Sequence, residues 1–134
     1  MTSASTNTSI NTSIVAISRR GAELARRLVD RLEGPVDFHV ARRFHKHGGV
    51  ETLFDLPARP VIQELFSESQ RLVLFMPVGA AIRLLASSLE DKHTDPAVVC
   101  VDDGGRFAVS LISGHQGGAD VLAQEVAEAL GATP

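Results

Sequence analysis

Residues 92–118 read KHTDPAVVCVDDGGRFAVSLISGHQGG, and this stretch decides the fold. Two apolar segments, 97–101 and 107–112, flank residues 102–105, which are of the types that favour turns. The pattern predicts a β-hairpin. Because antiparallel strands return the chain to where it started, we expect the polar residues at the two ends of the stretch to lie close together in space.

The rest of the chain alternates between apolar segments and segments with helical periodicity. Residues 14–17 and 72–76 are apolar throughout, as in strands buried on both faces of a sheet. Residues 36–40 alternate, as in a strand with one wetter face, and residues 41–57 are the least regular part. We therefore expect an α/β fold: a mostly parallel, Rossmann-like three-layer sheet with helices on both faces and the hairpin at one edge.

Helical spacing of apolar residues predicts helices that follow Gly21, Pro60, Pro77 and Gly118. In the helix after Pro77, the stripe expected to face the core consists of Ile82, Leu85, Ala86 and Leu89.

Length and composition place the chain among ordinary globular proteins. Its 134 residues suit a single α/β domain over residues 14–134, after a disordered tail over residues 1–13 that is rich in Ser, Thr and Asn. The net charge of -3 and the absence of Trp and Tyr argue against nucleic-acid binding. The sequence contains neither a signal peptide nor a membrane-length apolar run, so we expect a cytoplasmic protein without membrane contact.

Open α/β sheets bind ligands outside the carboxyl ends of their strands. Three glycine-containing joints between strands and helices, at residues 18–21, 77–79 and 113–118, are expected to meet on that side. Glycine in such joints lets the backbone approach a ligand closely.

The joint at residues 113–118 supports two interpretations. The free N–H groups at the start of the last helix can cradle a carboxylate or phosphate, with His115 acting as acid, base or donor. Alternatively, the joint is a tight turn capped by Ser113, with His115 merely packed.

The segment 92–96 also has two interpretations. His93 is suited to proton transfer at neutral pH, Asp95 can orient an imidazole or a water, and Lys92 can hold an anion. The alternative is a solvated helix end, where the helix dipole favours Lys and His. Arg83 either reaches into the crevice from the preceding helix or is solvated.

A protein-bound metal is not expected. His39, His45 and His47 lack a Cys or carboxylate at a structural-zinc spacing. Asp102 and Asp103 fit turn chemistry better than an acid–base pair. The lone Cys100 lies in an apolar strand and is expected to be a small buried hydrophobe.

Three motifs carry a resemblance to a known family: residues 78–85, 91–99 and 110–119, which include the runs Lys-His-Thr-Asp-Pro-Ala and Ser-Gly-His-x-Gly-Gly-Ala. They resemble the N-terminal domain of the cobalamin biosynthesis protein G family, the cobalt-precorrin-5A hydrolases. The resemblance implies an enzyme that opens a δ-lactone on a cobalt-containing tetrapyrrole and releases acetaldehyde. The cobalt then arrives chelated in the substrate, and the protein needs no cofactor of its own.

On this reading, the catalytic residues are His93 as general base, Asp95 as its orienting partner and His115 as the donor to the leaving oxygen, with the two histidine roles interchangeable. The residues expected to bind substrate are Gly79, Arg83, Lys92, Thr94, Ser113, Gly114, Gly117 and Gly118. The sequence departs from the family pattern at Gln116 and Asp120, where an apolar residue and an amide are expected.

Two other functions remain open. The chain can be a non-catalytic tetrapyrrole-binding module that serves a partner domain, or a small-anion or nucleotide-binding domain with no corrinoid link. Family members usually continue beyond the position of Pro134, so a C-terminal-domain partner or a homodimer is expected for either corrinoid reading.

Overall fold

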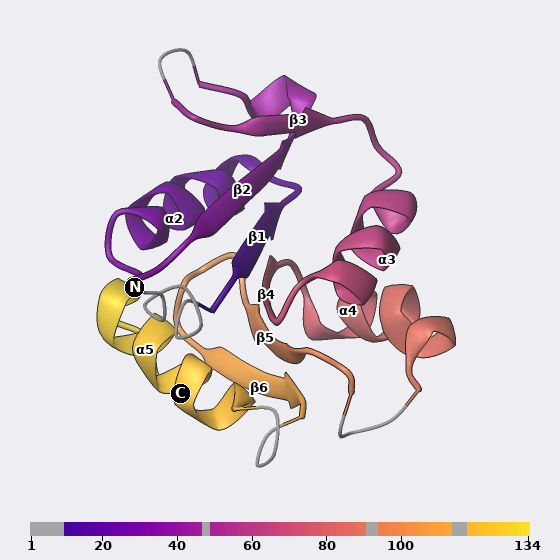
Figure 1. Ribbon diagram of the computed structural model, residues 1–134. Helices are drawn as coiled ribbons and strands as arrows, with labels where there is room; N and C mark the ends of the chain where they lie inside the picture. The colour runs from indigo at the N-terminus through magenta and orange to yellow at the C-terminus, as the bar shows by residue number, and fades with distance from the viewer. Residues whose placement is uncertain (1–9, 47–48, 91–93, 114–117) are drawn as a thin grey trace, which may run out of the picture.

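The computed structural model describes residues 10–46, 49–90, 94–113 and 118–134. Its centre is a single six-stranded sheet in the order β3-β2-β1-β4-β5-β6 (Figure 1). All neighbouring pairs are parallel except β5 and β6, which form the predicted antiparallel hairpin at one edge. The strands are β1 (Thr12–Ala16), β2 (Val36–Ala41), β3 (Thr52–Phe54), β4 (Arg71–Phe75), β5 (Ala97–Val101) and β6 (Ala108–Ile112).

Helices cover both faces of this sheet, which confirms the predicted three-layer α/β fold. Figure 1 shows α2 (Arg19–Val29) and α5 (Ala119–Leu130) on one side, and α3 (Arg59–Glu68) and α4 (Val78–Leu85) on the other. Two short 3₁₀ helices, η1 (Arg42–Phe44) and η2 (Ala86–Ser88), follow β2 and α4. No helix in these described parts of the chain has the length and apolar composition needed to cross a bilayer.

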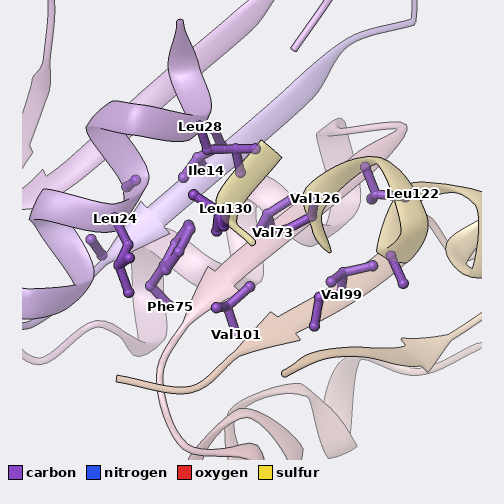
Figure 2. Close-up of a cluster of buried hydrophobic side chains, with 14 of the residues drawn as sticks. Ile14, Leu24, Leu28, Val73, Phe75, Val99, Val101, Leu122, Val126 and Leu130 are labelled. Atoms are coloured by element: carbon purple, nitrogen blue, oxygen red, sulfur yellow. The ribbon is translucent and has the colours of Figure 1, made fainter. Parts of the chain in front are cut away.

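The alternation of side chains along the central strands produces two cores. Ile14, Phe75 and Val99 point towards α2 and α5, where they pack against leucines and valines of both helices (Figure 2). The intervening residues, such as Val15 and Leu74, face α3 and α4. Each fully buried side chain of this size contributes roughly 1.5–3 kcal/mol.

The hairpin turn is organised by one carboxylate. Asp102 accepts hydrogen bonds from the backbone N–H groups of Gly104, Arg106 and Phe107 at 3.1, 3.0 and 2.8 Å. Gly105 has a φ of +67°, and a Cβ there would lie 3.1 Å from the Leu24 side chain. The pair Asp102 and Asp103 therefore includes one residue with a structural role in the turn, as the turn interpretation predicted.

Cys100 is buried in β5, as expected for a small hydrophobe. Its thiol donates to the carbonyl oxygen of Met76 at 3.0 Å. Burial raises the pKa of the Cys100 thiol to about 11, so the thiolate is strongly disfavoured at neutral pH.

The predicted tail over residues 1–13 is wrong for Thr12 and Ser13. Both are buried in β1, because the backbone of this segment pairs with β2 on one side and β4 on the other. The Ser13 hydroxyl lies 2.7 Å from the Ser69 hydroxyl, and this hydrogen bond satisfies both buried groups.

Two further details of the fold differ from the sequence prediction. Of the stripe predicted for this helix, Leu85 is buried, but Ile82 is 52% exposed and Leu89 is 48% exposed, because Ala81 shares the buried face of α4 with Leu85. Ala86 is exposed as well. Because the helix ends at Leu85, helical spacing no longer predicts which residues face the core at positions 86 and 89. The irregular segment 41–57 contains η1 and the short edge strand β3, which pairs with β2.

Strand polarity corrects the expectation that three joints meet on one side of the sheet. Because β6 runs antiparallel to the other strands, the joint that follows Ile112 lies beside the start of β5, at the amino edge of the parallel strands. The joints at residues 18–21 and 77–79 follow β1 and β4, and therefore lie at the opposite, carboxyl edge.

Candidate functional site

The two polar segments that flank the hairpin meet at the amino edge, in what we call the hairpin corner (residues 94–96, 113 and 118 among those described). The Ser113 hydroxyl donates to the backbone carbonyl of Asp95 at 3.3 Å, across 18 positions of sequence. The register explains the contact, since Val98 near the start of β5 pairs with Ile112 at the end of β6. The flanks of the two motifs are thus brought together.

The Asp95 carboxylate has a partner that the sequence analysis missed. Both of its oxygens accept from the backbone N–H of Glu90, at 3.3 and 3.1 Å. This contact closes the loop between η2 and β5, so Asp95 has a structural role besides the predicted one. A carboxylate has about four acceptor sites, which leaves capacity for a further donor.

The start of α5 has a glycine at its N-cap. Gly118, with a φ of +85°, is the N-cap residue, and no side chain caps this end of the helix. The Ala119 N–H donates to the backbone carbonyl of Ser113 at 3.1 Å. Ser113 therefore closes the turn through its carbonyl, with its own φ at +62°. The residues that its hydroxyl would cap lie outside the described part of the chain, so capping by Ser113 stays a prediction. A Cβ at Gly118 would meet no atom of the described residues within 4 Å.

A hollow of about 290 Å³ lies next to the hairpin corner. It is bounded on one side by α3 residues and on the other by the loop that carries Glu90 and Asp95. Its lining consists of Gln63, Phe66, Ser67, Ser88, Glu90, Thr94, Asp95 and Pro96. Thr94 and Asp95 are the two predicted site residues that face it.

The remaining predicted residues fall into two groups. Lys92, His93, Gly114, His115 and Gly117 lie outside the described residues. Gly79 and Arg83 are not at the hairpin corner: Gly79 follows β4 at the carboxyl edge, and the five residues of β4 separate the two edges by about 16 Å.

Arg83 lies one turn further along α4 and is exposed. Its carbonyl accepts from the Arg59 guanidinium at 3.4 Å.

At the carboxyl edge, a buried ionic cluster holds the loop after β2 against α2. Glu51, whose side chain is only 3% exposed, accepts from Arg26 at 2.6 and 3.2 Å and lies 3.1 Å from His45 Nδ1. The Arg26 hydrogen bond, aided by those from the Lys46 N–H and His45, lowers the pKa of Glu51 to about 2. We call Arg26, His45 and Glu51 together the Glu51 clamp. Its members are 6 and 25 positions apart, a separation that follows no recognisable motif.

The histidines of the described chain offer no metal site. His39 is half-buried, its Nδ1 has no hydrogen-bond partner among the described residues, and burial lowers its pKa. Within residues 10–46, 49–90, 94–113 and 118–134, no group of three His, Cys, Asp or Glu side chains is arranged to hold a metal ion.

The sequence matches the model of the family described as Cobalamin synthesis G N-terminal over residues 60–134, more than half of the chain. The chain belongs to this family. The resemblance drawn from the three motifs is therefore confirmed, and the matched region runs from α3 to the end of the chain, including the hairpin corner.

Two curated relatives are each named cobalt-precorrin-5A hydrolase. The protein from Priestia megaterium is 40% identical over 124 residues, which cover 90% of this chain and 33% of the relative. The protein from Salmonella typhimurium strain LT2 is 35% identical over 114 residues, which cover 85% of this chain and 31% of the relative. The chain thus spans about a third of the length of both relatives.

A solved structure supports the fold. A cobalamin biosynthesis protein G homolog from Sulfolobus solfataricus superposes with a TM-score of 0.68 at 24% identity. The match covers 92% of this chain and 35% of that one. The α/β architecture of this Cobalamin synthesis G N-terminal domain is therefore shared with that homolog.

Proposed function

We propose that this chain takes part in the hydrolysis of the δ-lactone of cobalt-precorrin-5A in cobalamin biosynthesis, with release of acetaldehyde and formation of cobalt-precorrin-5B. The names of the two relatives and the family membership support this function. The observation that carries the proposal on the structural side is the Ser113–Asp95 hydrogen bond. These two residues each lie two positions from a histidine of the proposed catalytic pair.

In the proposed mechanism, His93 takes a proton from water, and the water oxygen attacks the lactone carbonyl. Lys92 and the N–H groups of Gly117 and Gly118 stabilise the resulting oxyanion. The ring C–O bond then breaks, and His115 protonates the leaving oxygen to give a carboxylate and a hydroxyl. Thr94, Ser113 and Gly114 bind the substrate beside this centre.

Acetaldehyde forms in a second step. The freed hydroxyl loses its proton, and the C–C bond that joins the two-carbon unit to the macrocycle breaks. The electron pair of that bond stays on the macrocycle, which is then protonated. The atoms and charges balance without a metal or redox cofactor of the protein, because the cobalt is part of the substrate.

The test is acetaldehyde release from cobalt-precorrin-5A by the wild-type chain and by His93→Ala. Loss of a positioned acid–base group is expected to lower turnover at least about a hundredfold. The control is His47→Ala, the same substitution at a histidine with no role in the mechanism, and it should retain wild-type turnover. A wild-type rate in folded His93→Ala would remove His93 from the chemistry.

A second candidate function is a non-catalytic tetrapyrrole-binding module that presents the intermediate to a partner domain or to a second copy of the chain. The engagement of the Asp95 carboxylate by the Glu90 N–H favours it, because the acceptor sites that this N–H occupies are not available to orient His93. This function predicts an optical change on titration with a cobalt corrinoid but no acetaldehyde from the chain alone. Acetaldehyde release by the isolated chain would contradict it.

A further inference from the structure

A cationic hollow lies beside the Glu51 clamp and shares Arg26 and His45 with it. It has a volume of about 330 Å³ and is formed by the first two turns of α2 and the segment that follows β2. Its lining residues are Arg19, Glu23, Arg26, Arg43, Phe44, His45 and Lys46.

The balance of charge in this hollow is opposite to that of the whole chain. Arg26 is neutralised by Glu51, which leaves Arg19, Arg43 and Lys46 against the single carboxylate of Glu23. The lining therefore carries an excess of about two positive charges, whereas the complete chain has a net charge of -3. Concave surfaces with one sign of charge concentrate ligands of the opposite sign.

These three cations form no ion pair with any residue that the structure describes. The neighbouring Arg42 gives a direct contrast, because its guanidinium pairs with Asp55 at 2.9 Å. The guanidinium of Arg43 lies 5.3 Å from the centre of the Phe44 ring. The cations of the hollow are thus exposed, and within the described part of the chain they have no ion pair, next to a loop that the Glu51 clamp holds.

A second hollow of about 330 Å³ adjoins the first, since both are lined by Arg26 and Lys46. Its apolar lining comes from Val29, Phe38 and Val50, and Val50 is 98% exposed. Asp30, Glu51 and Gly49 complete it. A cationic hollow and a hollow of mixed apolar and charged lining therefore lie side by side, with Arg26 and Lys46 at their junction. Asp30 offsets one of the positive charges, which leaves an excess of about one over the two hollows.

We infer that this pair of hollows is a binding site for a ligand that carries several carboxylates on an apolar body. The planar forks of Arg19 and Arg43 match the geometry of a carboxylate, and the apolar residues of the adjoining hollow offer a surface for the body of the ligand. The site is independent of the proposed hydrolysis, because it lies at the opposite edge of the sheet from the hairpin corner.

The experiment uses the intact ¹⁵N-labelled chain and four probes. Cobyrinic acid is a cobalt corrin with seven carboxylates, its heptamethyl ester lacks those charges, citrate lacks the apolar body, and inorganic phosphate is a compact anion. Cobyrinic acid is expected to shift the amide resonances of residues 19–26 and 43–46, and to bind at least about tenfold more tightly than the other three probes. Shifts confined to residues 94–96 and 118–121 would overturn the assignment and support the hairpin corner instead.

Two double variants with equal loss of charge separate a local site from a general electrostatic effect. Arg19→Ala/Arg43→Ala removes two cations of the hollow and should raise the Kd for cobyrinic acid at least about tenfold. Arg20→Ala/Arg106→Ala removes two exposed arginines outside it and should change the Kd less than about twofold. Equal weakening in both variants, or ester binding as tight as acid binding, would overturn the proposal. Citrate or phosphate binding as tight as that of cobyrinic acid would do the same.

Discussion

The two edges of the sheet are held together by different forces. At the hairpin corner, the loops are joined by hydrogen bonds that involve backbone groups, from Ser113 to the Asp95 carbonyl and from the Glu90 N–H to the Asp95 carboxylate. At the carboxyl edge, the loop after β2 is held by the ionic contacts of Glu51 with Arg26 and His45. Hydrogen bonds to backbone groups thus hold the hairpin corner, and paired charges hold the loop after β2.

The hairpin corner and the cationic hollow are also supported as sites by different observations. The match to the family covers residues 60–134, which include the hairpin corner, whereas the residues of the cationic hollow all precede position 60. The general rule for α/β sheets favours the carboxyl edge. The two family motifs that flank the hairpin favour the amino edge, because the single antiparallel strand carries the second of them there, whereas the motif at residues 78–85 begins at the carboxyl edge. The two edges are therefore best treated as separate sites with separate tests.

The largest expected effect concerns α4, which begins at the carboxyl edge and leads back towards the hairpin corner. Leu85→Ala removes a side chain that is 1% exposed and packs in the core beneath α3 and α4, and should cost about 2–4 kcal/mol of unfolding free energy. Ile82→Ala, on the same helix but 52% exposed, should cost less than about 1 kcal/mol. Urea unfolding measures both, and equal losses would contradict the observed orientation of α4.

The next prediction tests whether the charge of Glu51 stabilises the loop after β2. Because the pKa of Glu51 is lowered to about 2, its contribution to stability is complete above the ordinary glutamate pKa of about 4.3 and is lost as the pH falls from there towards 2. Glu51→Gln should therefore lower the unfolding free energy at pH 7 by about 2 kcal/mol.

The control for this prediction is the pH dependence itself. The difference between wild type and Glu51→Gln should shrink as the pH is lowered through this window, because the wild-type carboxylate becomes protonated. Chemical unfolding at pH 7, 4 and 2.5 measures it. A difference that stays constant with pH would show that the clamp does not act through the charge of Glu51.

The smallest effect is expected at the hairpin corner. Asp95→Ala removes the acceptor of the Glu90 N–H and should cost about 1 kcal/mol, the usual net value of one hydrogen bond. Asp95→Asn keeps one acceptor oxygen and should cost about half as much. The midpoint of thermal unfolding compares the two variants. Equal destabilisation would mean that the contact with Glu90 does not hold this loop.

The sequence predicts the layers of this fold because local signals agree with the tertiary structure. The apolar run of β5, the turn residues from Asp102 to Gly105 and the stripe of α5 each specify one element without ambiguity. The strand β3 was missed, because three residues are too few for a periodic pattern. The buried face of α4 was predicted correctly at Leu85 and wrongly at Ile82, because a helix of eight residues does not fix the phase of its stripe.

The candidate site was predictable only in part. The proximity of residues 95 and 113 follows from hairpin geometry, and the structure confirms it for these two residues. The Glu51 clamp was not predictable, because Arg26 and Glu51 meet only after α2 has packed on β2. The same holds for the Glu90–Asp95 contact, which depends on the exact course of the loop after η2. The catalytic roles of His93 and His115 remain predictions.

The buried thiol of Cys100 gives the sheet an intrinsic chemical reporter. It packs in the core between the sheet and the α3 and α4 layer, and its Sγ is hydrogen-bonded to the Met76 carbonyl, so an alkylating reagent reaches it only when this core opens. Burial raises its pKa to about 11, which disfavours the reactive thiolate while the core is closed. As the only cysteine of the chain, it makes the rate of covalent labelling a direct readout of how often the centre of the protein comes apart.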